Sequence, residues 1–283
     1  MPYLNANGTQ LFYRDWGTGR PVVFVTSWAL SSIMWQQQMQ HFAENGFRAV
    51  GYDRRGHGRS DDPGAGYDFD TLADDLAALI EHLDLADVTL VGHSMGGGEI
   101  VRYLTRHGDD RVAKIVLVGS TVPCLGQLPD NPDGVPAAAS DQLLARLRVD
   151  FGGWIDENAG AFFGDGLPGC EVPKATRDWT VRDCMSVNLN AAIACTATNV
   201  AADFRPELAK ITVPALVVHG DHDASAPLEL TGRVTADLIP DAELKVYANT
   251  AHAIYLTHTE QLNADLLDFV SRATSPRAAQ ALS

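Results

Sequence analysis

Short apolar runs alternate along the chain with longer segments in which apolar residues recur every three or four positions. The runs are rich in β-branched residues, which favour strands. They cover Gln10–Trp16, Pro21–Thr26, Arg48–Asp53, Val88–Gly92, Lys114–Gly119, Ala215–Gly220 and Glu243–Tyr247. Two stretches, 22–25 and 115–118, contain no polar residue, as expected of parallel strands buried between helices. The alternation predicts an α/β fold with a mostly parallel, doubly wound central sheet flanked by helices.

The segment between the third and fourth runs has a clear helical period. Its apolar residues recur from Phe69 to Leu83, and the acidic residues Asp74, Asp75 and Glu81 fall opposite them. This pattern predicts an amphipathic helix with one face on the sheet and the acidic face in water.

The stretch from Thr121 to Val213 contains no convincing strand. It begins with a Pro/Gly/Asp-rich loop at 123–136 and continues with helical patterns at 141–151 and 175–204. We expect a helical cap over the carboxyl edge of the sheet, where open α/β sheets bind ligands. The predicted organisation is a core of residues 1–120 and 214–283 with a cap insertion at 121–213. Five aromatic residues are expected to line or support this cap: Phe151, Trp154, Phe162, Phe163 and Trp179.

Composition excludes several classes of protein. Of the 283 residues, 46% are hydrophobic and 20% are charged, which supplies enough apolar material for a core and excludes disorder. The 36 acidic and 21 basic residues give a formal charge of −15, which repels phosphate backbones. We therefore expect no nucleic-acid partner.

No segment has the pattern of an export signal or a membrane span. The first residues lack a charged and then apolar leader, and no apolar run approaches the ~20 residues that a spanning helix needs. The four cysteines form no CxxC pair, and no Gly-rich phosphate loop is present. These observations predict a cytoplasmic protein with free thiols, no membrane partner, no metal and no cofactor.

A GxSxG motif provides the candidate nucleophile. Ser94 stands between Gly92 and Gly96, after a predicted strand and before a predicted helix. A sharp strand-to-helix turn lifts such a serine clear of the sheet, and the flanking glycines avoid collisions across the turn. We predict that Ser94 is a nucleophile; the alternative is a structural turn serine.

A serine hydroxyl needs a general base, and in this fold the order along the chain is serine, acid, histidine. His252 follows a predicted strand and precedes the last amphipathic segment, so it is the candidate base. Asp221 and Asp223 follow the strand at 215–218, and we choose Asp223 as the acid, with Asp221 as its turn-forming neighbour.

Acyl transfer also needs an oxyanion hole, which is a pair of N–H donors facing the reacting carbonyl oxygen. The residue after the nucleophile, Met95, supplies one backbone N–H. The second is expected from the loop after an early strand, where Trp28 is the candidate; its alternative role is as a wall of the pocket.

The remaining histidines are expected to have structural or solvated positions. His57 is predicted to shape its loop, His93 to pack beneath the nucleophile, and His219 and His222 to bracket the acid turn. A metal site near residue 220 is disfavoured because no distant ligand completes it. The others fall on helical faces or ends: His41, His82, His107 and His258.

With these motifs the sequence resembles the α/β-hydrolase superfamily and, within it, the bacterial cofactor-free (non-haem) haloperoxidase and aryl-esterase subfamily. The matching segments are Asp53–Ser60, Thr71–Leu85, Leu90–Glu99, Arg102–Gly108, Arg111–Gly119, Leu216–Asp223 and Gln261–Val270. The resemblance implies a Ser94–Asp223–His252 triad with Trp28 and Met95 as oxyanion donors. It further implies hydrolysis of small esters and lactones without haem or metal, and assembly into homo-oligomers in many members.

The chain departs from this subfamily around the predicted oxyanion loop. Thr26 and Ser27 stand where the family usually has His-Gly, and Ala29 stands where members noted for perhydrolysis carry Pro. The first change is expected to reshape the loop or to add a hydroxyl to the pocket. The second makes peracid formation less expected as the main reaction.

Together these features predict a serine hydrolase of small carboxylic esters or lactones that works through an acyl-enzyme. The alternatives use the same triad for lactam hydrolysis, perhydrolysis, C–C bond hydrolysis, acyl transfer or cofactor-free dioxygenation, since fold does not fix function. A low-turnover binding protein is a further alternative.

Overall fold

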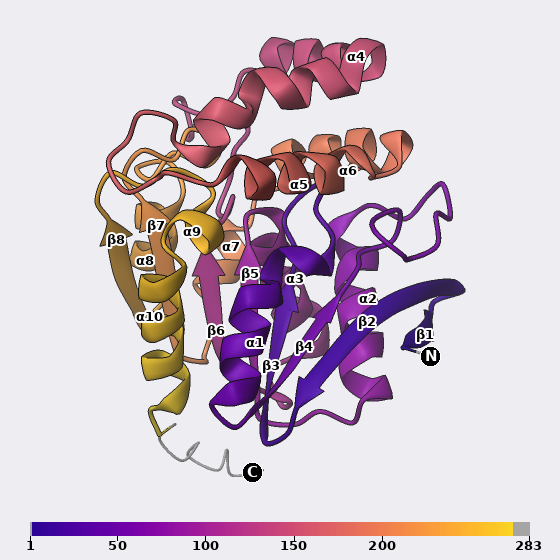
Figure 1. Ribbon diagram of the computed structural model, residues 1–283, viewed down its shortest axis with the longest axis vertical. Coiled ribbons are helices and arrows are strands. Elements are labelled where there is room, and N and C mark those ends of the chain that lie inside the picture. The colour runs from indigo at the N-terminus through magenta and orange to yellow at the C-terminus, as the bar shows by residue number, and fades with distance from the viewer. Residues whose placement is uncertain (1, 274–283) are drawn as a thin grey trace.

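A computed structural model describes residues 2–273 and contains one central sheet of eight strands (Figure 1). The strands are β1 (Tyr3–Ala6), β2 (Thr9–Gly17), β3 (Arg20–Val25), β4 (Phe47–Tyr52), β5 (Val88–His93), β6 (Val112–Val118), β7 (Ala215–Gly220) and β8 (Ala242–Tyr247). Their spatial order is β1-β2-β4-β3-β5-β6-β7-β8. Strand β2 is antiparallel to both of its neighbours, and every other pairing is parallel. The predicted mostly parallel sheet is therefore confirmed.

All seven predicted runs form strands, but the sequence reading missed β1. This strand has only four residues, and its side chains alternate between exposed and buried. It pairs antiparallel with β2 at the edge of the sheet, with Tyr3 opposite Phe12. A short edge strand without β-branched residues carries too weak a pattern to be recognised.

Helices cover both faces of the sheet, and alternate strand residues point into two separate cores. Val22 and Phe24 of β3 pack in one core with side chains of α1 (Gln36–Glu44) and α10 (Thr259–Ser271). Val23 and Val25 point to the other core, which includes side chains of α2 (Phe69–His82) and α3 (Met95–His107). The two cores explain why the strands read as unbroken apolar runs.

Helix α2 confirms the predicted amphipathic segment, with one exception on its acidic face. The Asp68 carboxylate caps its start by accepting the Thr71 N–H at 2.9 Å. Asp75, expected in water, is buried and accepts hydrogen bonds from Nε and Nη2 of Arg55, both at 2.7 Å. Helical spacing places Asp75 near the edge of the apolar stripe, where a partner from a neighbouring loop makes its burial tolerable.

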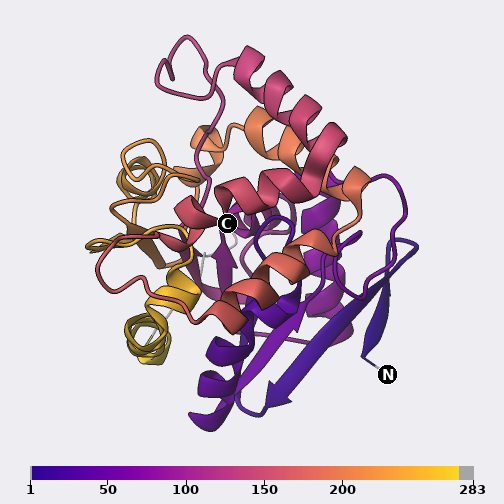
Figure 2. The same cartoon turned by 45° about the horizontal axis from the view of Figure 1, so that its top comes forward.

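Three helices of the predicted cap lie beyond the carboxyl ends of the parallel strands (Figures 1 and 2). They are α4 (Ala137–Phe163), α5 (Lys174–Met185) and α6 (Leu189–Ala201). Helix α4 kinks at Asp150, whose Oδ1 accepts the Gly153 N–H at 2.8 Å and so starts the second half. The helical pattern at 175–204 is divided between two helices, because Asn188 caps the start of α6 by accepting the N–H groups of Asn190 and Ala191.

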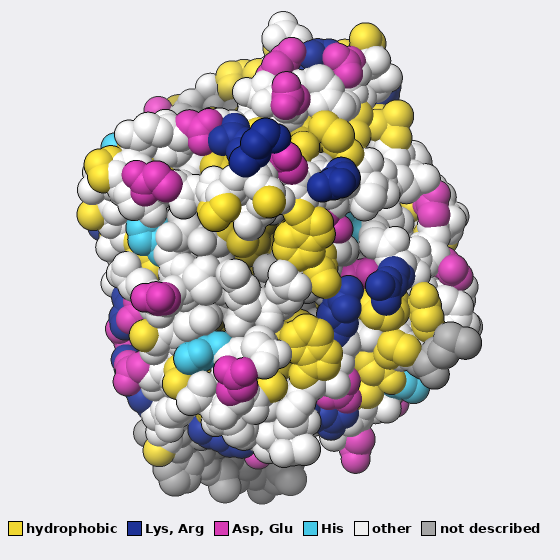
Figure 3. Space-filling view, viewed as in Figure 1, with side chains coloured by type: hydrophobic (Ala, Val, Ile, Leu, Met, Phe, Trp, Pro, Cys, Tyr) yellow, Lys and Arg dark blue, Asp and Glu magenta, His cyan; other side chains and the backbone are white. Residues whose placement is uncertain are grey.

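The surface shown in Figure 3 carries interspersed charges despite the net charge of −15. Lys and Arg side chains alternate there with Asp and Glu, and no large patch of one sign is seen on this face. Among the described residues, 2–273, no helix is both long and apolar enough to cross a membrane.

Candidate active site

Ser94 lies at the sharp turn between β5 and α3. Its φ of 55° and ψ of −122° are strained values for a residue with a side chain. A Cβ atom at Gly92 would lie 2.7 Å from the Gly96 carbonyl oxygen, and one at Gly96 would lie 2.8 Å from the Thr26 carbonyl oxygen. Both flanking positions therefore require glycine, which agrees with the steric reason given for the motif.

His252 and Asp223 come from the loops after β8 and β7, and their side chains meet. His252 Nδ1 lies 2.7 Å from Asp223 Oδ2, and both residues are buried. The other carboxylate oxygen, Oδ1, accepts the N–H groups of Ser225 at 2.9 Å and Ala226 at 2.8 Å. An Nδ1–H bonded to the carboxylate leaves Nε2 of His252 with a free lone pair, which is the form a general base needs.

Asp223 is held as an anion by its surroundings. Burial alone would raise the pKa of its carboxyl, but His252 and the backbone donor Ala226 outweigh burial and lower that pKa. Asp221 has a different environment: its carboxylate is partly exposed and contacts His222 Nδ1 at 2.7 Å and the Thr250 N–H at 3.1 Å. Of the two aspartates, the one chosen from the sequence is the one beside His252.

Ser94 and His252 open into one cavity of about 570 Å³ between the sheet edge and the helices above it. Phe162, near the end of α4, packs edge-on against the His252 ring at 5.6 Å between centroids. The Phe162 carbonyl also accepts the N–H of Ala253 at 2.9 Å, so α4 is joined directly to the loop that carries His252. Much of the remaining wall is apolar and includes Leu125, Leu143, Leu147, Trp154, Ile155 and Phe163.

A small polar group interrupts the apolar wall and was not predicted from the sequence. Thr121 Oγ1 donates to Asn199 Oδ1 at 2.8 Å, and both residues line the cavity with Thr196. Thr196 and Asn199 are three residues apart in a helix otherwise rich in Ala, so they share one face of α6. That spacing was the available signal, but nothing in it indicated which way the face points.

The loop after β3 carries the predicted donor Trp28. Its indole Nε1 donates to the Ala192 carbonyl of α6 at 2.9 Å, and its ring packs edge-on against Trp154 at 5.6 Å. Neither the Trp28 N–H nor the Met95 N–H donates to any residue in the described part of the chain. Trp28 lines the cavity as well, so its side chain forms a wall while its backbone N–H stays unpaired.

A buried ion pair, not foreseen from the sequence, supports this loop. The Arg54 guanidinium donates to the carbonyls of Thr26 at 2.7 Å and Ser27 at 2.9 Å, and its Nε donates to Glu99 Oε1 at 2.6 Å. Tyr52 also donates to Glu99, at 2.8 Å. Burial raises the pKa of the Glu99 carboxyl, and the adjacent Arg54 opposes that rise. Because Glu99 belongs to α3, the pair links the loop of Trp28 to the helix that begins at Met95.

Three other histidines have the structural positions expected of them. His93 packs against the His252 ring at 4.6 Å, and its Nε2 lies 2.9 Å from the His252 carbonyl oxygen. His219 Nε2 lies 2.7 Å from the Ala226 carbonyl oxygen, and His57 Nδ1 lies 2.9 Å from the Arg55 carbonyl oxygen. Burial lowers the pKa of His93 and of His57 to about 3 each, so both are neutral at pH 7.

Within residues 2–273, no three His, Cys, Asp or Glu side chains are grouped in a way that could hold a metal ion. The four cysteines are free thiols, and burial raises the pKa of Cys184 and of Cys195 to about 12. Ser94, His252 and Trp28 line the cavity, and the Asp223 carboxylate is bonded to His252.

The sequence model of the alpha/beta hydrolase fold matches residues 20–259. The chain belongs to the α/β-hydrolase family. Within that family it falls in the non-haem haloperoxidase subfamily, as the sequence resemblance indicated. It is 41% identical over 268 residues to a non-heme chloroperoxidase from Kitasatospora aureofaciens, an alignment that covers 94% of this chain and 98% of the relative.

Other α/β-hydrolase relatives carry names of hydrolytic enzymes or of peroxidases. A bifunctional esterase/perhydrolase from Acinetobacter calcoaceticus is 38% identical, with 93% of this chain and 97% of the relative covered. The crystal structure of a bromoperoxidase from Bacillus anthracis superposes with a TM-score of 0.91 at 34% identity, covering 95% of this chain and 99% of that one. An enol-lactonase from Burkholderia xenovorans LB400 gives a TM-score of 0.85 at 26% identity, with 96% and 100% covered. The protein is therefore a hydrolase-type enzyme of this family.

Proposed function

We propose that the protein hydrolyses small carboxylic esters or lactones through an acyl-enzyme on Ser94. The observation that carries this proposal is the buried contact between His252 and Asp223, with His252 and Ser94 both lining one cavity large enough for a small ester. Support also comes from the relatives named as an esterase/perhydrolase and an enol-lactonase.

In the proposed reaction, Ser94 Oγ attacks the carbonyl carbon while its proton passes to Nε2 of His252. Asp223 stabilises the imidazolium that forms, and the N–H groups of Trp28 and Met95 hold the oxyanion. The leaving alkoxide takes the proton from His252 as the C–O bond breaks. His252 then deprotonates a water molecule, which attacks the acyl-enzyme and releases the acid and Ser94.

The two parts of the chain have different roles in this proposal. We propose that the core, residues 1–120 and 214–283, carries the reacting groups and that the cap, 121–213, selects the substrate. The wall formed by Leu143, Leu147 and Trp154 favours an apolar acyl or alcohol part. The Thr121–Asn199 pair offers a polar contact in the same cavity.

Perhydrolysis, the second activity in the name of one relative, is disfavoured by the loop geometry at Ala29. This residue has a φ of 58°, whereas proline, which perhydrolytic members carry there, is fixed near −65°. The loop therefore has a backbone path that a proline at this position could not follow.

The decisive experiment compares wild type with Ser94→Ala on a panel of phenyl acetate, γ-butyrolactone, δ-valerolactone and a γ-lactam, with peracetate formation measured in parallel. Ser186→Ala, at an exposed serine after α5, is the matched control. We expect ester or lactone turnover in wild type and control, and a loss of at least ~10³-fold in Ser94→Ala. Full activity in Ser94→Ala, or turnover confined to the lactam, would overturn the proposal.

A further inference from the structure

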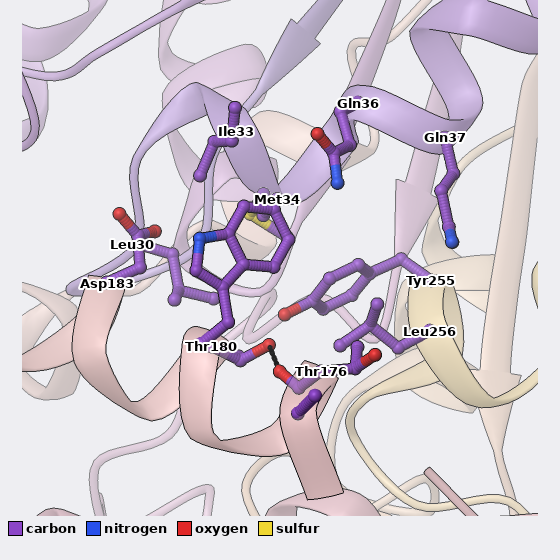
Figure 4. A pocket seen from close by; sticks show the side chains of 12 residues that line it. Leu30, Ile33, Met34, Gln36, Gln37, Thr176, Thr180, Asp183, Tyr255 and Leu256 are labelled. Atoms are coloured by element: carbon purple, nitrogen blue, oxygen red, sulfur yellow. Dashed lines mark hydrogen bonds between the residues drawn. The ribbon is translucent and has the colours of Figure 1, made fainter. Parts of the chain in front are cut away.

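A second cavity of about 280 Å³ lies beside the catalytic one, between the 3-10 helix η1 (Ser32–Trp35), helix α5 and helix α9 (Ile254–Thr257) (Figure 4). Leu30 and Thr180 line both cavities, so these side chains form part of the wall between them. The proposed hydrolysis assigns no role to this second space.

The Tyr255 hydroxyl is the unusual group in this pocket. The residue is 1% exposed, and its ring packs against Trp35 and His93 at centroid distances of 5.9 and 5.3 Å. The hydroxyl oxygen has no hydrogen-bond partner among residues 2–273. Burial raises the Tyr255 pKa far above its ordinary value, so the group keeps its proton. Figure 4 shows this hydroxyl directed from α9 toward Thr180 of α5.

Two other polar groups that line the pocket already have partners. Asp183 accepts the Ser31 N–H at 2.9 Å and the Ser31 hydroxyl at 2.8 Å. Thr180 Oγ1 donates to the Thr176 carbonyl at 3.0 Å. A buried hydroxyl without a partner is rare in folded proteins, so Tyr255 stands out as a donor placed for a ligand.

The walls restrict the kind of ligand. Trp179 contributes a flat apolar indole to the lining of the pocket. Leu30, Met34 and Leu256 add further apolar surface (Figure 4). The Asp183 carboxylate lines the same pocket and disfavours a ligand that carries a negative charge. These features fit a small, neutral, flat molecule with one oxygen acceptor.

We propose that this pocket is a separate binding site for small neutral phenols, with the ring against Trp179 and the oxygen accepting from the Tyr255 hydroxyl. The proposal needs no chemistry at Ser94.

The test uses 4-fluorophenol as the probe, with binding followed by fluorine NMR, and fluorobenzene as the probe that lacks the oxygen. Tyr255→Phe removes only the hydroxyl and is expected to weaken 4-fluorophenol binding about fivefold, with fluorobenzene unaffected. Ala175→Trp places a bulky side chain at the exposed rim and is expected to abolish binding of both probes. The anion 4-fluorobenzoate is expected to bind more weakly than the phenol.

Two controls separate this site from the catalytic cavity. Leu143→Trp narrows only the catalytic cavity and should leave binding unchanged, as should Ser94→Ala. The proposal is overturned if Tyr255→Phe and Ala175→Trp bind 4-fluorophenol as wild type does, or if only Leu143→Trp weakens it. Because binding is measured without turnover, a failure of the esterase assay leaves this result interpretable on its own.

Discussion

Replacing Asp223 with Asn tests the proposed triad most directly, because the structure dictates how the new amide must sit. The N–H groups of Ser225 and Ala226 both point at Oδ1 and require an acceptor there. The Asn carbonyl oxygen must take that place, which turns the amide NH2 toward Nδ1 of His252. Nδ1 then becomes the acceptor, and the ring proton moves to Nε2, the atom that has to receive the Ser94 proton.

The expected loss in kcat is about 10⁴-fold, or roughly 5.5 kcal/mol of transition-state stabilisation. Stability should change far less, because the two backbone hydrogen bonds survive and the third is replaced by a neutral one from the amide NH2 to Nδ1; we expect a loss of about 1–2 kcal/mol in the free energy of unfolding. Initial rates on the best ester, urea unfolding and the nitrogen-15 shifts of His252 together measure rate, stability and tautomer.

Asp221→Asn is the matched control, since it makes the same change two residues away on a carboxylate that contacts His222 instead. It should retain activity within about threefold. The reasoning is refuted if Asp223→Asn keeps more than a tenth of the activity, if Asp221→Asn shows the larger loss, or if the His252 proton stays on Nδ1.

Three further predictions follow from buried charges and strained backbone. Arg54→Met leaves Glu99 as an unpaired buried acid and should lower the free energy of unfolding by about 3–5 kcal/mol in urea titrations, more than Glu99→Gln does; equal losses would contradict this. Ala29→Gly should keep or raise the melting temperature because φ is 58° there, whereas Ala29→Pro should lower it and reduce esterase activity; a stable, active proline variant would contradict the strained loop. His93 and His57 have native pKa values of about 3 against ~6.5 when unfolded, so the unfolded chain binds more protons between these values and stability must fall as the pH falls from 6.5 toward 3. Each contributes a slope approaching about 1.4 kcal/mol per pH unit, and His93→Phe should remove its share of the decline in urea midpoint between pH 7 and pH 5.

Patterns confined to one element were readable from the sequence. The unbroken apolar run around Val23 and the strand–Ser94–helix order are local signals, and both predict structure that is present. Asp221 and Asp223 both follow one strand, and the contact with His252 falls on Asp223, the aspartate chosen from the sequence.

Features that depend on contacts between distant segments were not readable. Asp75 looks like a surface acid on its helix, and only Arg55 from another loop explains its burial. Asn199 and Tyr255 sit in ordinary helical patterns, so their positions in cavity walls follow from how helices are placed over the sheet. Helical periodicity identifies a buried face but does not identify what that face meets.

The hydrogen bond from Ala253 to the Phe162 carbonyl has a consequence for exchanging the upper helices between family members. A transplanted segment from another enzyme would have to end with a carbonyl at the same point in space, or the imidazole of His252 would lose part of its scaffold. Grafting for new selectivity should therefore succeed more often when the foreign segment begins after Phe163, so that the native Phe162 carbonyl is kept, than when the foreign segment replaces Phe162. The transplanted helices of such a hybrid could then vary freely, while the imidazole of His252 keeps its native support.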